Sequence, residues 1–294
     1  MQNQSNRERQ WTILSLIQWT TSYFKSHHIE NPRSDAEILL AYALNLERID
    51  LYLRYDQPLQ PGELTRFKLL IKRRIQREPT AYIIETKEFW SMDFRVTTDV
   101  LIPRPETECL VERALAGLSG DIPLRILELG TGSGAIPIAL ASEKPNHHYI
   151  ASDQSVFAVR LAAKNAKRHG LNHLISFFTG DWFQPLNEDA LFDMIVSNPP
   201  YIRTEEIDRL EPEIFRYEPR VSLDGGKDGL RCLEQILSQA HHYLKPKGKL
   251  VLEMGYDQRE SVQAMLNAMD CYDNISFFMD YSGHDRGVQL EKKS

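Results

Sequence analysis

The sequence has few cysteines and no long apolar run. Three of its 294 residues are cysteine, namely Cys109, Cys232 and Cys271, and no two of them form a Cys-x-x-Cys pair. Scattered thiols in odd number are typical of small buried side chains in a reducing compartment. No stretch comes near the roughly 18 uninterrupted apolar residues of a membrane span, and the polar residues 1–10 lack the apolar segment of a secretory signal. We therefore expect a cytoplasmic protein without a membrane partner.

The sequence also lacks an excess of positive charge. Its formal net charge of −6 argues against a strongly electropositive surface for nucleic acid. Hydrophobic residues make up 42% of the chain and charged residues 26%, a balance that can bury a core and excludes disordered and fibrous proteins. Because the length exceeds what one core usually spans, we expect one main domain and one smaller domain.

The charge divides unevenly along the chain. Residues 1–79 contain 12 Lys and Arg against 9 Asp and Glu, a net charge of +3, so residues 80–294 carry −9. The first part is predicted to be helical, because Ser34 and Glu37 form a capping box and residues 62–77 carry an apolar stripe that ends before Pro79. The other face of this second helix is basic, with Arg66, Lys68, Lys72, Arg73, Arg74 and Arg77. This face is either simply solvated or a docking surface for an acidic or nucleic-acid-containing partner.

A change of pattern at residue 82 predicts a β-hairpin. Residues 82–84 and 89–96 are rich in β-branched and aromatic side chains, and residues 91–93 form the expected turn between two strands. Pro103 and Pro105 then prevent regular structure until a helix begins near Pro105. We interpret the hairpin as the connection between two domains.

From residue 124 onward, short apolar runs alternate with helical segments. The predicted strands are residues 125–129, 149–152, 175–178, 194–197, 250–253, 275–279 and 288–291. The helices between them include residues 134–142, 156–169, 230–244 and 260–268. This alternation predicts an α/β fold with a doubly wound, mostly parallel seven-stranded sheet that helices cover on both faces.

The first of these strands ends in a glycine-rich turn. The residues of the turn are Gly130, Thr131, Gly132, Ser133 and Gly134. Glycines let the backbone bend tightly and approach a ligand, and the helix that begins at Ala135 presents free N–H groups. Asp153 ends the second strand, where its carboxylate can accept both hydroxyls of a ribose. We therefore expect a cofactor at this turn.

The residues of the turn leave the kind of ligand open. Gly130, Gly132 and Ala135 also satisfy a loose G-x-G-x-x-A dinucleotide pattern, so the ligand is either NAD or an adenosyl compound without pyrophosphate, and a purely structural turn is the third possibility. Asp181 and Trp182, just past the third strand, favour the adenosyl compound. Asp181 can accept an adenine amino hydrogen and Trp182 can cover the ring, although Trp182 fits a core aromatic equally well.

A second motif, Asn198-Pro199-Pro200-Tyr201, follows the strand at residues 194–197. Alone it is also explained as a strand terminator, but it lies at the sheet edge where ligands bind in open α/β folds. An amide or exocyclic amine nitrogen is a poor nucleophile, because its lone pair is delocalised. The Asn198 side-chain oxygen and the Pro199 carbonyl can each accept one N–H, and Tyr201 can fix the plane of the group. This arrangement localises the lone pair for methyl transfer without a strong base.

Several motifs together resemble one family. They lie at residues 35–37, 51–53, 81–83, 88–90, 102–107, 129–135, 180–183, 196–202, 217–220, 223–230 and 255–257. The chain resembles class I S-adenosylmethionine-dependent methyltransferases and, within them, the HemK-like family, which methylates the glutamine side-chain amide of the Gly-Gly-Gln motif in peptide chain release factors. The most particular motifs are Ile-Pro-Arg-Pro-Glu-Thr at residues 102–107 and Tyr-Glu-Pro-Arg at residues 217–220.

The resemblance implies a domain plan and a set of contacts. It implies a helical substrate-recognition domain at residues 1–79, a β-hairpin linker at residues 80–100 and a Rossmann-like methyltransferase domain at residues 101–294. S-adenosylmethionine, which leaves as S-adenosylhomocysteine, is expected at residues 130–134, Asp153, Trp182 and Asn198, with no metal. The catalytic residues would be Asn198, Pro199 and Tyr201, and these together with Pro200 would grip the substrate glutamine. The release factor is the expected partner, with no direct contact to nucleic acid.

Two rival functions differ in class. A DNA or RNA adenine amino-methyltransferase faces the same lone-pair problem, but base flipping and a polyanionic substrate need a basic surface, whereas residues 80–294 are net acidic. A non-catalytic adenosyl-binding or partner-binding module would not need both Asn198 and Tyr201. We therefore favour the release factor methyltransferase.

Overall fold

The chain folds into two compact units, one of which is discontinuous in sequence. The computed structural model describes residues 11–118, 120, 122–187 and 189–294. The first unit, here the helical unit, comprises the described residues up to Glu85 together with Pro212–Tyr217. The second, here the sheet unit, comprises Thr86–Glu211 and Glu218–Ser294. A short segment far along the sequence therefore belongs to the amino-terminal unit.

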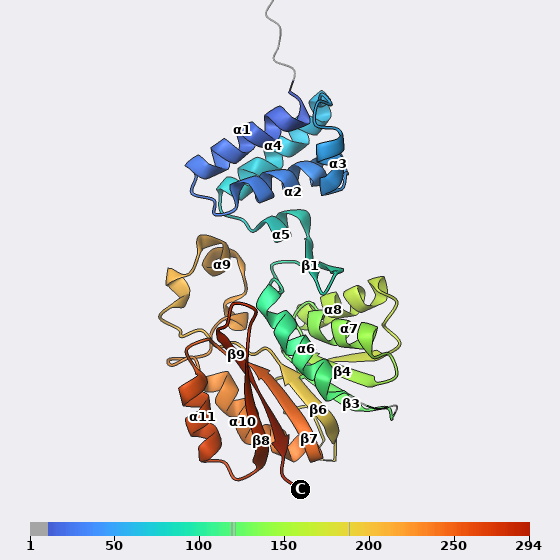
Figure 1. Cartoon of the computed structure of the whole chain (residues 1–294), viewed down its shortest axis with the longest axis vertical. Coiled ribbons are helices and arrows are strands. Elements are labelled where there is room, and N and C mark those ends of the chain that lie inside the picture. The colour runs from blue at the N-terminus through green and yellow to red at the C-terminus, as the bar shows by residue number, and fades with distance from the viewer. Residues whose placement is uncertain (1–10, 119, 121, 188) are drawn as a thin grey trace, which may run out of the picture. The chain divides into compact units, whose positions relative to one another are not determined.

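The amino-terminal helices of the helical unit pack around one apolar core. The helices of this unit are α1 (Ile13–Ser26), α2 (Pro32–Leu44), α3 (Arg48–Leu53), α4 (Pro61–Ile75), α5 (Thr80–Ile84) and α9 (Pro212–Tyr217), labelled in Figure 1 where there is room. Phe67 and Ile71 of α4 are buried in this core, and Leu64 and Ile75 pack at its edge. The apolar stripe predicted for residues 62–77 is thus confirmed.

The start of α2 differs from the prediction. The helix begins at Pro32 with Asn31 as its N-cap, two residues before Ser34. Proline suits the first helical position, because its missing N–H would have no partner there. The prediction that Ser34 and Glu37 form a capping box is therefore wrong. The Glu37 carboxylate instead accepts hydrogen bonds from three side chains, those of Arg33, Arg48 and Tyr52.

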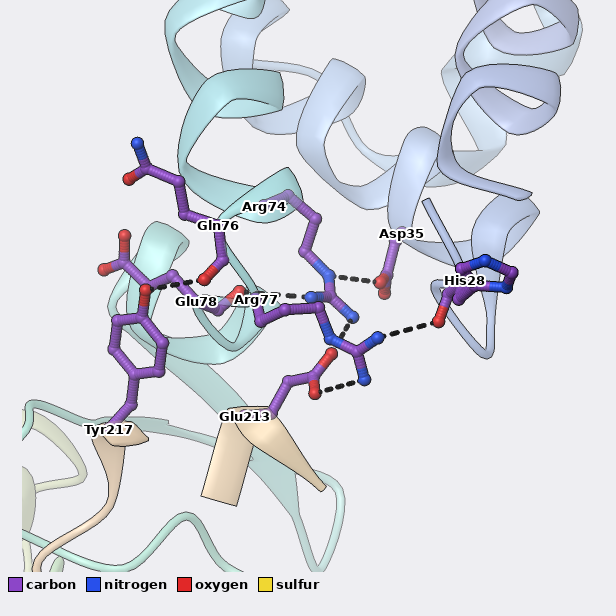
Figure 2. A network of polar contacts seen from close by, with 8 residues as sticks. All are labelled: His28, Asp35, Arg74, Gln76, Arg77, Glu78, Glu213 and Tyr217. Atoms are coloured by element: carbon purple, nitrogen blue, oxygen red, sulfur yellow. Dashed lines mark hydrogen bonds and ion pairs between the residues drawn. The ribbon is translucent and has the colours of Figure 1, made fainter. Parts of the chain in front are cut away.

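A buried ion-pair network holds α9 within the helical unit (Figure 2). The Arg74 side chain, only 6% exposed, lies between two carboxylates, 2.7 Å from Asp35 and 2.8 Å from Glu213. The other Glu213 oxygen lies 2.7 Å from Arg77. Burial alone would raise the pKa of Glu213, but the hydrogen bonds from Arg77 and Arg74 outweigh it and lower that pKa. Each buried charge of this network thus has an opposite charge beside it.

Most basic side chains of residues 62–77 also make polar contacts within the helical unit. Arg66 donates to the carbonyl of Ala43, and Arg73 pairs with Glu78. Together with Arg74 and Arg77, four of the six basic side chains are therefore engaged within the helical unit. Arg66 and Arg73 nevertheless keep exposed surface, so a solvated face and a docking surface both remain predictions for this helix.

The hairpin is shorter than predicted, and its turn lies elsewhere. Residues 82–84 are helical in α5, because Pro79 caps a helical turn that buries Tyr82 and Ile83. The strands are β1 (Thr86–Phe89) and β2 (Met92–Arg95), paired antiparallel. Trp90 and Ser91 form the turn, both with φ of 54°, which is the two-residue geometry that matches strand twist. The predicted strand at residues 82–84 and the turn at residues 91–93 are therefore wrong.

The sheet unit confirms the predicted α/β fold. Its main strands are β3 (Arg125–Leu129), β4 (His148–Asp153), β5 (Ile175–Thr179), β6 (Phe192–Ser197), β7 (Leu244–Glu253), β8 (Tyr272–Met279) and β9 (Asp285–Lys292). Its helices are α6 (Glu108–Gly117), α7 (Ala135–Glu143), α8 (Val156–Arg168), α10 (Arg231–Tyr243) and α11 (Arg259–Asn267), with short 3-10 turns at Pro105–Thr107, Ile207–Arg209 and Arg220–Ser222. All seven predicted strands are present, in the order β5-β4-β3-β6-β7-β9-β8, and β9 is antiparallel to both neighbours.

Helices cover both faces of this sheet, as Figure 1 shows. Helices α6, α7 and α8 contribute to one apolar cluster, and α10 and α11 contribute to another on the opposite face. Alternate residues of β3 enter the two clusters, since Ile126 belongs to the first and Leu127 to the second. A strand buried on both faces reads as a continuous apolar run, which is why these strands were predictable.

Two absences noted in the sequence have structural counterparts. All three cysteines are free thiols, and Cys109 and Cys232 are buried, as expected of small core residues. Among the residues that the structure describes, no helix has both the length and the apolar character needed to cross a bilayer.

Candidate active site

The candidate site lies where three adjacent strands end. Strand β3 lies between β4 and β6, and Leu129 pairs with Ser152 on one side and with Ser197 on the other. Because the chain runs from β3 outward to β4 and β5 and then returns to β6, this edge is the topological switch point of the sheet. A cavity of about 290 Å³ opens there. Its lining includes seven of the predicted site residues: Gly130, Gly132, Asp153, Asp181, Trp182, Asn198 and Pro200.

The glycine-rich turn forms one wall of the cavity. Gly130 and Thr131 donate their N–H groups to the carbonyl of Ser152, at 2.9 and 2.8 Å. Gly132 has φ of +54°, and a Cβ at this position would meet no other protein atom within 4 Å. The glycine therefore keeps open a space beside the backbone, in addition to allowing the bend. Thr131 and Ser133 are buried in the turn itself.

Asp153 anchors this turn and also faces the cavity. Its Oδ2 accepts the N–H of Gly132 and its Oδ1 accepts the N–H of Ser155, both at 2.9 Å. Burial raises the pKa of Asp153, and the two backbone hydrogen bonds offset part of that rise. Each carboxylate oxygen keeps a second lone pair for a hydroxyl donor.

Trp182 lies where the cavity meets the apolar core. It lines the cavity and also packs against the apolar cluster under α10. A Cβ on Gly130 would lie 3.9 Å from its Cζ3 atom, so the ring lies close to the glycine turn. The neighbouring Asp181 is exposed, and its carboxylate accepts a hydrogen bond from Gln184 at 2.9 Å. An acceptor and an aromatic face therefore lie side by side at this wall.

The Asn-Pro-Pro-Tyr motif places Asn198 and Tyr201 in different surroundings. Asn198 lines the cavity, and its Nδ2 donates to Oγ1 of Thr107 at 3.1 Å. Tyr201 does not line the cavity but packs against the core, and its hydroxyl donates to Oε1 of Glu253 at 3.1 Å. The structure therefore brings Asn198 to the cavity, whereas the described position of Tyr201 sets it beside a buried carboxylate.

The two most particular sequence motifs meet at Glu218. Its carboxylate accepts the N–H of Ile102 at 3.3 Å and the guanidinium of Arg104 at 2.6 Å. Burial raises the pKa of Glu218 even though Arg104 lowers it. Arg104, for which the sequence predicts no role, thus anchors the loop that carries Thr107 to Asn198.

Several residues of the site were missed in the sequence. The segment 98–101 lines the cavity, but no motif marks it. Glu128 in β3 is buried, neither of its carboxylate oxygens has a hydrogen-bond partner, and burial raises its pKa to about 8. Glu253 ends β7, and burial raises its pKa to about 7. A charged residue within or at the end of an apolar strand is the signal that would have identified both carboxylates.

Solved structures share this architecture. The hMettl16 catalytic domain in complex with the MAT2A 3′UTR hairpin 6 superposes with a TM-score of 0.55 at 15% identity, covering 81% of this chain and 85% of that chain. A methyltransferase from Pyrococcus furiosus superposes with a TM-score of 0.51 at 17% identity, covering 79% and 99%. At such identities the likeness shows the fold alone, which is that of Rossmann-like methyltransferases.

Sequence comparisons identify the family. Residues 15–84 match the PrmC N-terminal domain, and residues 107–226 match the methyltransferase small domain. The release factor glutamine methyltransferase of Geobacter sulfurreducens is 43% identical over 95% of this chain and 96% of its own length. The enzyme of the same name from Rhodopirellula baltica is 34% identical over 98% and 99%. With its site at the switch point of a methyltransferase sheet, the chain belongs to the release factor glutamine methyltransferase family.

Proposed function

We propose that this protein transfers a methyl group from S-adenosylmethionine to the side-chain amide nitrogen of the glutamine in the Gly-Gly-Gln motif of peptide chain release factors. The observation that carries the proposal is the setting of Asn198. Its Nδ2 is bonded to Thr107 at the wall of the cavity, so its Oδ1 is the end left for a substrate amide.

The chemistry asks the protein to localise a lone pair. Asn198 Oδ1 and the Pro199 carbonyl can accept the two N–H bonds of a primary amide, which holds the nitrogen in one orientation toward the cavity. Proline residues at 199 and 200 restrict the backbone that presents this carbonyl. The proton can leave after the methyl group arrives, so positioning and acceptor dipoles supply the catalysis.

The residues of the cavity fit an adenosyl cofactor. Gly132 leaves space beside the turn, Asp153 offers free lone pairs for ribose hydroxyls, and the exposed face at Trp182 suits a flat ring. When bound, S-adenosylmethionine supplies an activated methyl group on a sulfonium. Family membership favours this cofactor over NAD.

The substrate class follows from the relatives. These relatives are named release factor glutamine methyltransferases, and the match extends over nearly the whole of both chains. This favours a protein amide over the exocyclic amine of adenine, which the Asn-Pro-Pro-Tyr motif alone does not exclude. A translation protein as partner and three free thiols together favour the cytoplasm as the place of the reaction.

The test is the variant Asn198→Ala. We expect kcat to fall at least 100-fold while the Kd for S-adenosylmethionine changes less than threefold, because the variant loses the amide acceptor but keeps the glycine turn. Mass spectrometry of the release factor measures the added methyl group, and calorimetry measures cofactor binding. Asn267→Ala, on the exposed face of α11, is the matched control and should leave both unchanged. If an oligonucleotide were methylated while the release factor gained no methyl group, the adenine methyltransferase would replace this proposal.

A further inference from the structure

A buried polar cluster lies behind the substrate motif. It consists of Thr107, Asn198, Tyr201 and Glu253, which come from three separate stretches of the sheet unit. Thr107 is 4% exposed and Glu253 is 1% exposed, so water has little access to either. Asn198 donates to Thr107, and Tyr201 donates to Glu253, each at 3.1 Å. Glu253 therefore lies one step behind the groups that the proposed reaction uses.

The bond from Asn198 to Thr107 decides which end of the amide faces the cavity. A primary amide has a donor end and an acceptor end of nearly equal size, so a half-turn of the side chain would exchange them. With Nδ2 on Thr107, Oδ1 is available to accept an N–H from a substrate amide. With the ends exchanged, two NH₂ groups would face each other and the substrate would lose its acceptor.

A hydroxyl hydrogen directed at Glu253 would fix the polarity of Thr107. A threonine hydroxyl has one hydrogen to donate, whereas an ionised carboxylate can only accept. Thr107 lies near enough to the Glu253 carboxyl to lower its pKa, although Oε2 has no hydrogen bond of good geometry. If the hydroxyl hydrogen of Thr107 points toward Glu253, its lone pairs face Asn198. The same carboxylate receives the Tyr201 hydroxyl, so one acceptor directs both ends of the motif.

The loop that carries Thr107 is itself anchored. Glu218 accepts the N–H of Ile102 and the guanidinium of Arg104, and the 3-10 turn Pro105–Thr107 follows directly. The backbone of Thr107 is therefore held independently of its side chain. The Thr107 hydroxyl can therefore rotate while the backbone that carries it stays in place, as a group that orients Asn198 requires.

We propose that Thr107 and Glu253 are positioning residues that hold the amide of Asn198 with its oxygen toward the substrate and fix the ring of Tyr201. This rests on the proposed function, because it assigns a task to residues that touch neither substrate nor cofactor. It adds to that function two hydrogen bonds of defined direction, from Asn198 to Thr107 and from Tyr201 to Glu253, behind the groups that would hold the substrate.

The first test removes the hydroxyl without changing the shape of the side chain. We expect Thr107→Val to lower kcat for release factor methylation 10- to 100-fold while KM for the release factor and Kd for S-adenosylmethionine change less than threefold. Thr107→Ser keeps the hydroxyl and should restore kcat to within threefold of the unmodified protein. Thr20→Val, at an equally buried threonine of the helical unit, is the matched control and should leave kcat unchanged.

The second test changes the carboxylate. Glu253→Gln preserves shape but adds a donor, so we expect kcat to fall at least 10-fold. Arg286, Glu106 and Tyr201 are the charged and titratable groups that act on Glu253. Because its pKa is raised to about 7, kcat of the unmodified protein should rise with pH through that region, and the Gln variant should lose this limb.

The outcomes separate this inference from the proposed function. If the unmodified protein leaves the glutamine unmethylated, the function fails. If it methylates the glutamine but Thr107→Val retains full kcat, the inference fails and the function stands. A loss in Thr107→Ser as large as in Thr107→Val would also overturn the inference, since packing rather than the hydroxyl would then matter, as would a loss confined to KM.

Discussion

The buried carboxyl groups of the two units differ in how fully they are paired. In the helical unit, Arg74 lies between Asp35 and Glu213, and the pKa of Glu213 is lowered. In the sheet unit, Glu128 has no hydrogen-bond partner, and burial raises its pKa to about 8. A buried charge that is fully paired stabilises the fold, whereas a buried carboxyl group without a hydrogen bond keeps its proton up to a raised pKa.

The largest effect is expected from breaking the paired cluster. Arg74→Met leaves Asp35 and Glu213 facing each other without the cation between them, which should cost about 3–5 kcal/mol of local stability. Because two units need not unfold together, the measurement is native-state hydrogen exchange of the α2 and α4 amides. Arg54→Met is the control, since Arg54 is 50% exposed and 3.8 Å from Asp50, and should cost less than about 1 kcal/mol. Equal losses in both variants would contradict the prediction.

A somewhat smaller effect is expected at the unpaired carboxylate. At pH values between 4.5, the ordinary pKa of a glutamate, and about 8, the raised pKa of Glu128, this residue keeps its proton in the folded protein and releases it in the unfolded chain. Stability should therefore fall as the pH rises through this interval, by an amount on the order of 3 kcal/mol. Glu128→Gln does not titrate and should flatten the profile. Urea unfolding of the sheet unit at pH 5 and pH 8.5 measures the difference, and parallel profiles for the two proteins would refute the assignment.

The smallest effect, and the opposite sign, is expected at Glu213. Its lowered pKa means that its contribution is present above pH 4.5 and is lost as the pH falls through the folded value. Glu213→Gln leaves Arg74 with Asp35, so the loss near neutral pH should be only about 1–2 kcal/mol. Hydrogen exchange of the α4 amides in both proteins, at pH 7 and at several values below pH 4.5, measures this loss. A loss that persists undiminished in acid would show that shape rather than charge is responsible.

The fold was predictable because its signals are local. The central strands of the sheet contain short apolar runs, and helices α8 and α10 each bury one apolar stripe. The prediction failed where burial overrides propensity, as in α5, where β-branched and aromatic residues form a helical turn because Tyr82 and Ile83 are buried. It also failed at α2, where a proline at the first helical position competed with the capping box at Ser34.

The site was predictable only where it follows the strands directly. Gly130, Asp153 and Asn198 each come at or just after a strand end, so the parallel sheet brings them together. The contacts behind them join distant positions, as between Thr107 and Asn198 or between Tyr201 and Glu253, and no spacing rule relates such pairs. The same limit explains the basic face of α4, whose partner Glu213 lies far along the chain.

The membership of α9 in the helical unit has a consequence for the order of synthesis. A ribosome that makes this chain completes the residues up to Glu85 first. At that point Arg74 still lacks its partner Glu213. That partner emerges only after residues 86–211, and hence after β6 and Asn198, have been made. The amino-terminal unit therefore gains its last ion pair late in translation. By then the strand that precedes Asn198 has also been made and can fold.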